Sequence, residues 1–167
     1  MTLLAVPAEI ETPACLRYKE VTIVTKLNPY LNFPGNTEEA FNFYKSVFGG
    51  DFTSVVRFRD MPMEGVTIPK ADEGKIMHIG LPIGSDNVLM ASDAVESLGQ
   101  QVAQGNNFYI SLHPDSKEDA DRVFRALSDG GTVEAPIADQ PWGDYWGAFR
   151  DRFGVQWMVN YTYPQEQ

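Results

Sequence analysis

Two stretches of the chain decide its fold: Asn36-Thr37-Glu38-Glu39-Ala40 and, 80 positions later, Ser116-Lys117-Glu118-Asp119-Ala120. Each stretch opens on a residue that caps helices well and has a carboxylate three positions later, where the helix dipole favours it. Apolar residues then recur at helical spacing, and a glycine pair, Gly49-Gly50 or Gly130-Gly131, follows at the same relative place. The matching start, stripe and stop predict two copies of one helix in a tandem duplication.

An alternating strand precedes each predicted helix, at residues 28–33 and 108–113. In the second strand, Phe108, Ile110 and Leu112 share one face, which we expect to meet the helix. Three further strand-like runs follow each helix, at residues 52–58, 75–81 and 87–92 and at residues 132–135, 145–150 and 155–163. The predicted fold class is therefore α+β, with two tandem βαβββ modules that form a cupped mixed sheet and carry the helices on its outer face.

These elements divide the chain into four parts. We expect an N-terminal extension at residues 1–25, module 1 at residues 26–98, a linker at residues 99–105 and module 2 at residues 106–164. A lone module of about 60 residues has exposed sheet edges and little core. The two modules are therefore expected to form one domain, whether they pair within the chain or between chains.

The composition argues against several classes of protein. Thirteen Lys and Arg against 23 Asp and Glu give a net charge of −10, which disfavours binding to nucleic acid. No apolar run approaches the ~20 residues of a membrane helix, so we expect no membrane association. Cys15 is the single cysteine, which leaves no intramolecular disulfide or thiolate zinc site. The first ten residues lack a basic region and a cleavage site, and we expect a cytoplasmic protein.

The paired modules, with Phe43-Tyr44 and Phe48-Gly49 at the end of the first helix, resemble the vicinal oxygen chelate superfamily, which includes glyoxalase I, bleomycin-resistance proteins and extradiol dioxygenases. Within it, residues 26–163 look most like the PhnB-like group. The motifs that carry this likeness are Pro29-Tyr30-Leu31-Asn32-Phe33, Leu89-Met90-Ala91-Ser92-Asp93, Trp142-Gly143-Asp144 and Asp151-Arg152-Phe153-Gly154-Val155-Gln156-Trp157. The resemblance implies a homodimer, because the cups of this superfamily are often completed across subunits.

Enzymes of the superfamily hold a divalent metal with one ligand from the first and fourth strand of each module. The resemblance puts these positions at about Asn28, Met90, Tyr109 and Met158. An amide, a phenol and two thioethers are a poor ligand set for a hard cation, so we expect no metal cofactor. We favour a protein of unassigned reaction that binds a small organic molecule in the cup without the usual metal site. The alternative is a metal-dependent lyase, isomerase or dioxygenase.

Strand alternation puts the candidate ligand-binding side chains on the sheet face opposite the helices. They are Tyr30, His78, Met90, Ser92, Tyr109, Ser111, His113, Met158 and Asn160, and the loop before residues 145–150 adds Trp142 and Asp144, which could close over a ligand. Phenols, hydroxyls, imidazoles and thioethers suit a mostly apolar organic molecule with a few hydrogen-bonding groups.

Each candidate also has a structural interpretation. His78 and His113 could serve as a general acid–base or as a rearranged metal pair. Their structural interpretations are a hydrogen-bonded strand histidine for His78 and a strand-end histidine before Pro114 for His113. Trp142 could line a pocket rim or pack within its loop, and Asp93 could cap a turn or face a ligand. The cup itself could be plugged by its own Met and Tyr side chains. Some PhnB-like proteins carry a methyltransferase label, but the chain has no G-x-G-x-G and the wrong order of elements for that class.

Overall fold

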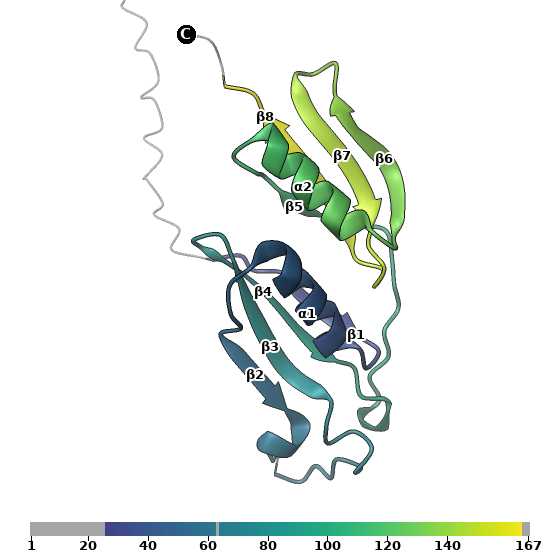
Figure 1. Ribbon diagram of the computed structural model, residues 1–167. Coiled ribbons are helices and arrows are strands. Elements are labelled where there is room, and N and C mark those ends of the chain that lie inside the picture. The colour runs from purple at the N-terminus through teal and green to yellow at the C-terminus, as the bar shows by residue number, and fades with distance from the viewer. Residues whose placement is uncertain (1–25, 63, 165–167) are drawn as a thin grey trace, which may run out of the picture.

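The computed structural model describes residues 26–62 and 64–164, and the predicted N-terminal extension at residues 1–25 lies outside the described residues. Each half runs strand, helix and three strands (Figure 1). The first half contains β1 (Tyr30–Phe33), α1 (Thr37–Phe48), β2 (Ser54–Arg57), the 3-10 turn η1 (Phe58–Asp60), β3 (Ile76–Ile83) and β4 (Asn87–Asp93). The second contains η2 (Glu96–Leu98), β5 (Ile110–Leu112), α2 (Lys117–Ser128), β6 (Thr132–Asp139), β7 (Asp144–Arg150) and β8 (Gln156–Thr162).

The strands form two four-stranded mixed sheets with the same topology, β1-β4-β3-β2 and β5-β8-β7-β6. In each sheet the first pair, β1 with β4 or β5 with β8, is parallel, and the other pairs are antiparallel. The predicted α+β class with two βαβββ modules is thus confirmed. The cup is built from two sheets lying side by side, because no backbone ladder joins β1 to β5 in the described chain.

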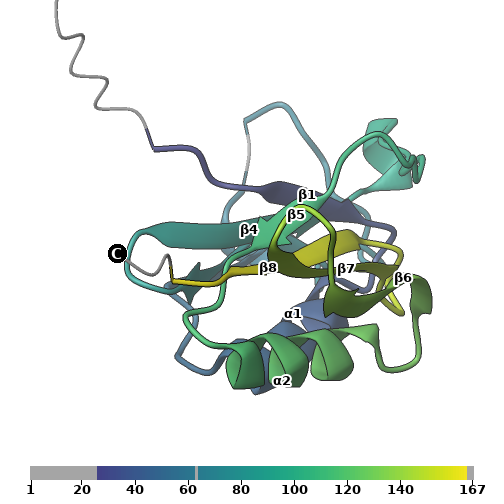
Figure 2. The same ribbon diagram turned by 90° about the horizontal axis from the view of Figure 1, so that it is seen from above.

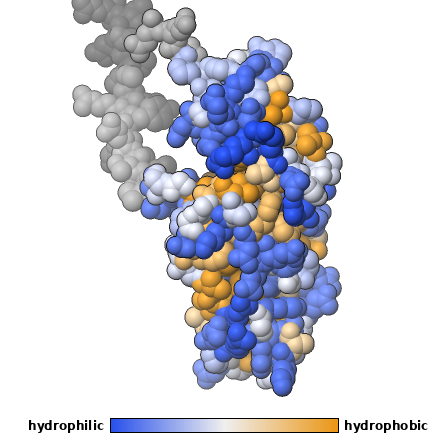
Figure 3. Space-filling view, viewed as in Figure 1, coloured by the Kyte–Doolittle hydropathy of each residue, from blue (hydrophilic) through white to orange (hydrophobic). Residues whose placement is uncertain are grey.

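Both helices cover the same side of the sheets (Figure 2). Their apolar stripes are buried against the strands, with Ala40, Phe41 and Tyr44 at no measurable exposure in α1 and the stripe Ala120, Val123, Phe124 and Leu127 buried in α2. On this side of the molecule, apolar residues show mainly near the middle and polar residues cover most of the rest (Figure 3). The opposite side of each sheet carries neither α1 nor α2.

One aromatic core joins the two modules within the chain. The rings of Tyr44 and Trp157 lie 5.6 Å apart, and Phe153 packs against Tyr44 at 6.0 Å. The Tyr44 hydroxyl donates to Asp151 Oδ2 at 2.7 Å, and the Trp157 indole donates to the same oxygen at 2.9 Å. Because this buried carboxylate binds donors from both halves, it fixes α1 against β8.

The helix caps of the two halves differ. Ser116 accepts a hydrogen bond from the Asp119 amide at 3.1 Å, as its position predicts. Asn36 stands at the N-cap position of α1 as predicted, but its side chain makes no cap hydrogen bond. Asp93, buried at the end of β4, takes its place and accepts from the Thr37 amide at 3.0 Å and the Thr37 hydroxyl at 2.6 Å. A carboxylate distant in the sequence therefore satisfies the helix terminus, and Asp93 has a structural role.

The predicted position of Phe108 is also wrong. Its ring is 57% exposed, because β5 begins only at Ile110 and Phe108 still belongs to the chain that enters the strand. No helix in the described part of the chain is both long enough and apolar enough to cross a membrane.

Candidate functional site

The sheet surface away from the helices has two parts, which we name face A on the first sheet and face B on the second. On face A the predicted residues Tyr30, His78, Met90 and Ser92 lie close together, since Tyr30 is opposite Met90 and Ser92 is one strand away from both Asn32 and His78. Their strand neighbours Leu31, Ile79 and Ala91 are buried on the other side, under α1. The alternation used in the sequence analysis therefore gives the correct orientation for these residues.

Tyr30 and His78 form a pair on face A. The phenol oxygen lies 3.4 Å from Nδ1 of the imidazole, and the rings are 5.9 Å apart and tilted. Ser92 donates to Asn32 Oδ1 at 3.2 Å beside them. The pair fits a hydrogen-bonded strand histidine, and an acid–base role for His78 stays a prediction.

Face B brings together Ser111, His113, Met158 and Asn160. Ser111 is opposite Met158, and its hydroxyl lies 3.0 Å from His113 Nε2. Asn160 donates to Thr162 Oγ1 at 3.3 Å and stands opposite Trp146. These side chains give face B the mixture of polar and apolar groups that the sequence predicts.

The loop residues lie at one end of face B. Trp142 is 62% exposed, and its ring meets Trp146 edge to face at 6.1 Å. Asp144 opens β7 and is opposite Thr162. Trp142 therefore packs on a neighbour in face B and keeps most of its surface free, which is compatible with both interpretations of this residue.

Tyr109 lies across the other end of face B. Tyr109 directly precedes β5, which is one edge strand of the sheet. Its hydroxyl donates to Glu134 Oε2 on β6, the opposite edge strand. This hydrogen bond, with lesser contributions from burial and from the Glu134 charge, raises the pKa of the Tyr109 phenol. Arg150 and Gln156 lie in the strands between them and are paired in register. At this end, the Tyr109 side chain crosses face B to reach Glu134.

The four positions that would bind a metal in the superfamily do not suit one here. The Asn28 amide oxygen accepts from the Val88 amide at 2.9 Å, and the Tyr109 phenol is bound to Glu134. The other two positions carry the thioethers of Met90 and Met158. Within residues 26–62 and 64–164, no group of three His, Cys, Asp or Glu side chains could hold a metal ion. A hard divalent cation does not fit this donor set.

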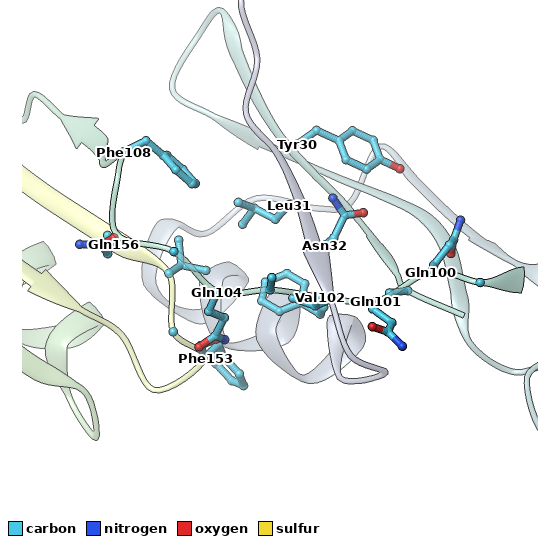
Figure 4. Close-up of a pocket in the computed structure, with 17 residues that line it drawn as sticks. Tyr30, Leu31, Asn32, Gln100, Gln101, Val102, Gln104, Phe108, Phe153 and Gln156 are labelled. Atoms are coloured by element: carbon cyan, nitrogen blue, oxygen red, sulfur yellow. The ribbon is translucent and has the colours of Figure 1, made fainter. Parts of the chain in front are cut away.

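Two of the hollows where the modules meet are lined in part by predicted site residues. One of about 640 Å³ is bounded by β1, residues 99–105 and the start of β8, and amide side chains project around it (Figure 4). A second of about 420 Å³ separates β1 from β5 and is lined by Tyr30, Tyr109 and Ser111 among mainly apolar residues. The other predicted site residues line neither hollow: His78, Met90, Ser92, His113, Trp142, Asp144, Met158 and Asn160. Within residues 26–62 and 64–164, faces A and B are therefore open surfaces.

The sequence analysis missed three polar residues of face B, namely Glu134, Arg150 and Gln156. Alternation along residues 145–150 and 155–163 could have placed Arg150 and Gln156 on the same side as Met158. Glu134 gave no such signal, because β6 has register shifts on both sides of Ala135 that break the alternation.

Comparison with known proteins gives relatives that match nearly their full length. Protein YjdN of Escherichia coli K12 is 29% identical over 149 residues, which cover 83% of this chain and 97% of YjdN. The crystal structure of PA1353 from Pseudomonas aeruginosa is 40% identical, with a TM-score of 0.72, and the match covers 83% of this chain and 98% of that one.

A PhnB protein from Bacillus cereus, labelled as a 3-demethylubiquinone-9 3-methyltransferase, shares the fold at 24% identity and a TM-score of 0.66, over 83% of this chain and all of that one. The family model described as Glyoxalase/Bleomycin resistance protein/Dioxygenase superfamily matches residues 26–159, most of the chain. With its two βαβββ modules and this match, the chain belongs to the Glyoxalase/Bleomycin resistance protein/Dioxygenase superfamily.

Proposed function

We propose that the protein binds a small, mostly apolar organic molecule on faces A and B, without a metal ion. The observation that carries the proposal is the composition of these faces, where hydrogen-bonding groups of Tyr30, His78 and Ser111 lie among the thioethers of Met90 and Met158. Sheet surfaces of this kind give an organic ligand apolar contact area and a few orienting hydrogen bonds.

The reaction, if the ligand is transformed, is unassigned. A metal-dependent lyase, isomerase or dioxygenase is the competing candidate, and the poor donor set at Asn28, Met90, Tyr109 and Met158 argues against it. We do not propose a methyltransferase. In the described residues each sheet has one parallel and two antiparallel strand pairs, as in a βαβββ module. Neither sheet is the doubly wound parallel sheet of the common methyltransferases.

The proposal includes a homodimer. Faces A and B are open in the described part of one chain, and a second copy lying over them would enclose a ligand. Exposed apolar residues beside the β1–β5 hollow, Leu27 and Phe108, support association. The acidic composition supports a protein without a nucleic-acid partner, and the single cysteine supports a cytoplasmic location; both remain predictions.

Native mass spectrometry of the full-length protein, purified without chelator, tests the proposal. We expect a species of two 18.7 kDa chains that carries an organic adduct and no stoichiometric metal. Stoichiometric Ni, Zn, Mn or Fe would favour the enzyme, and a bare single chain would contradict both binding and dimerisation.

Variants locate the ligand. His78→Ala and Met90→Ala should reduce the retained adduct while the unfolding midpoint stays near that of the wild type. Met61→Ala is the matched control, because Met61 is exposed in the loop after η1 and belongs to no strand of either face. A large loss of stability in His78→Ala without a change in binding would show that His78 is structural.

A further inference from the structure

Arg150 is the one cationic strand residue in the described chain whose side chain lies on an open face. The strands contain two arginines and no lysine. Arg57 lies on the helix side of the first sheet, where its guanidinium donates to Glu38 of α1. Arg150 lies on the same side of β7 as Trp146 and Ala148. It is opposite Gln156 on β8, which puts it at the end of face B that Tyr109 crosses.

The guanidinium of Arg150 has donors without acceptors. Its Nη2 lies 3.9 Å from Glu134 Oε1, which is too far for a hydrogen bond, and its buried Nε has no partner among the residues that the structure describes. Arg57 shows the opposite condition, with Nη2 at 2.6 Å from Glu38 Oε1 and Nη1 at 2.8 Å from the Gly74 carbonyl oxygen. A buried donor that lacks an acceptor costs free energy, so an added acceptor at Arg150 would be stabilising.

The Glu134 carboxylate lies between two groups that bind carboxylates. The Tyr109 hydroxyl donates to one of its oxygens, and the Arg150 guanidinium faces the other at the longer distance. The hydrogen bond to Glu134 also raises the pKa of Tyr109, which keeps the phenol protonated as a donor. An organic acid in the place of Glu134 could accept from the phenol and from Arg150 in the paired geometry that guanidinium favours.

We propose that Tyr109, Arg150 and Gln156 form a subsite for the carboxylate of an organic acid, and that Glu134 occupies this subsite until the ligand displaces it. The inference rests on the proposed function and adds the ligand class to it. The apolar body of the acid would lie along face B over Met158, toward Trp146. Glu134 can leave at low cost because β6 is an edge strand with an irregular register.

Titration calorimetry with benzoate on the full-length protein tests this subsite, with benzamide as the uncharged probe of the same shape. Glu134→Gln removes the competing negative charge and keeps the side-chain shape. We expect it to tighten benzoate binding by about tenfold, as for one charged hydrogen bond, and to leave benzamide binding unchanged. Arg150→Gln should weaken benzoate binding by at least as much.

Two matched variants control for net charge. Glu38→Gln makes the same charge change in an Arg–Glu pair on the helix side, and Arg125→Gln removes an exposed cation of α2. Neither should change benzoate affinity by more than about twofold. Circular dichroism checks that each variant is folded, and Glu134→Gln carries the test alone if Arg150→Gln does not fold.

The inference is overturned if Glu134→Gln binds benzoate no more tightly than Glu38→Gln does, if a folded Arg150→Gln binds it as the wild type does, or if neither the wild type nor Glu134→Gln binds it. In each case, an organic adduct that is lost in Met90→Ala would leave the proposed function intact. Absence of both the adduct and benzoate binding would overturn both.

Discussion

Modules 1 and 2 have the same order of helices and strands, but they differ in what their buried carboxylate contacts and in the charged residues of their open face. Asp93 in module 1 binds the start of α1, whereas Asp151 in module 2 binds the junction between the modules. Face A has Tyr30 beside His78, whereas face B has Arg150 beside Glu134. The duplicated pattern thus specifies the elements, while the polar residues that differ determine how the halves join and what each face could bind.

The largest loss of stability is expected when one of the two buried carboxylates is removed, and it should be greater at Asp151 than at Asp93. Asp151→Ala leaves four donors without their acceptor, from Tyr44, Phe153, Val155 and Trp157. We expect a loss of about 4 kcal/mol in the free energy of unfolding, since several buried donors lose a charged partner. Urea denaturation measures it.

Asp93→Ala is the matched variant in module 1 and leaves three donors, two from Thr37 and one from Ile76. We expect a loss of about 3 kcal/mol, smaller than at Asp151 because no contact between modules is broken. A loss below about 1 kcal/mol at Asp151 would contradict its role as the link between the halves.

Two strand glycines give the next contrast. A Cβ at Gly147 in β7 would lie 2.7 Å from both the Ile137 Cα and the Phe124 ring, so backbone would have to move. A Cβ at Gly80 in β3 would lie 2.6 Å from Thr53 Oγ1, the end of a side chain that can rotate. We expect Gly147→Ala to cost about 2 kcal/mol and Gly80→Ala less than half of that, by thermal or urea unfolding. Equal costs would refute this account of β6 packing on β7.

The junction also predicts a pH dependence. Burial, with the Asp151 charge and hydrogen bond as further causes, holds the pKa of Tyr44 far above its usual value of about 10. The folded phenol keeps its proton where the unfolded one loses it, so the stability from Tyr44 is complete below pH ~10 and declines as the pH rises above that value. Tyr44→Phe should flatten the decline above pH 10 by up to about 1.4 kcal/mol per pH unit.

Unfolding free energies at pH 9, 10 and 11 check this prediction. Tyr145→Phe is the comparison within module 2: the hydrogen bond to Asp121 of α2 raises the pKa of Tyr145 as well, but this phenol is not at the junction, so its removal should flatten the decline less than Tyr44→Phe does. The same slope in Tyr44→Phe and the wild type would mean that the Tyr44 phenol ionises in the folded state.

Much of the fold could be predicted from the sequence, because helical stripes and strand alternation are local patterns. Both helices begin one residue after the predicted capping residue, and the face of His78 followed from alternation. The errors arose where the structure departs from a local rule. A bulge in β3 opposite Arg57 interrupts the strand alternation and puts Ile76 in the core, and the distant Asp93 makes the side-chain hydrogen bonds to the start of α1 that Asn36 does not make.

The candidate site was predictable only in part for the same reason. Regular strands gave the orientation of Met90 and Met158, while the contact of Tyr109 with Glu134 joins opposite edges of a sheet and depends on the irregular register of β6. The two hollows at the module junction also need the three-dimensional placement of residues 99–105.

The smallest expected difference in stability is between variants of the two helix-capping positions, Ser116 and Asn36. Ser116→Ala removes the hydrogen bond to the Asp119 amide and should cost about 1 kcal/mol. Asn36→Ala removes no cap bond and should cost less than about 0.5 kcal/mol, because Asp93 already binds the start of α1. A larger loss at Asn36 than at Ser116, in urea titrations, would contradict the assignment of Asp93 as the cap of α1.

The central claim, that the open faces are where small molecules bind, is tested most directly by methyl NMR of the full-length protein with ¹³C-labelled methionine. Met90 and Met158 report on faces A and B, and Met61 is an exposed reference. With a standard library of small organic fragments, the account predicts that the Met90 and Met158 signals shift while Met61 stays unchanged. Fragments that shift Met61 alone, or that bind without moving the Met90 and Met158 signals, would contradict it.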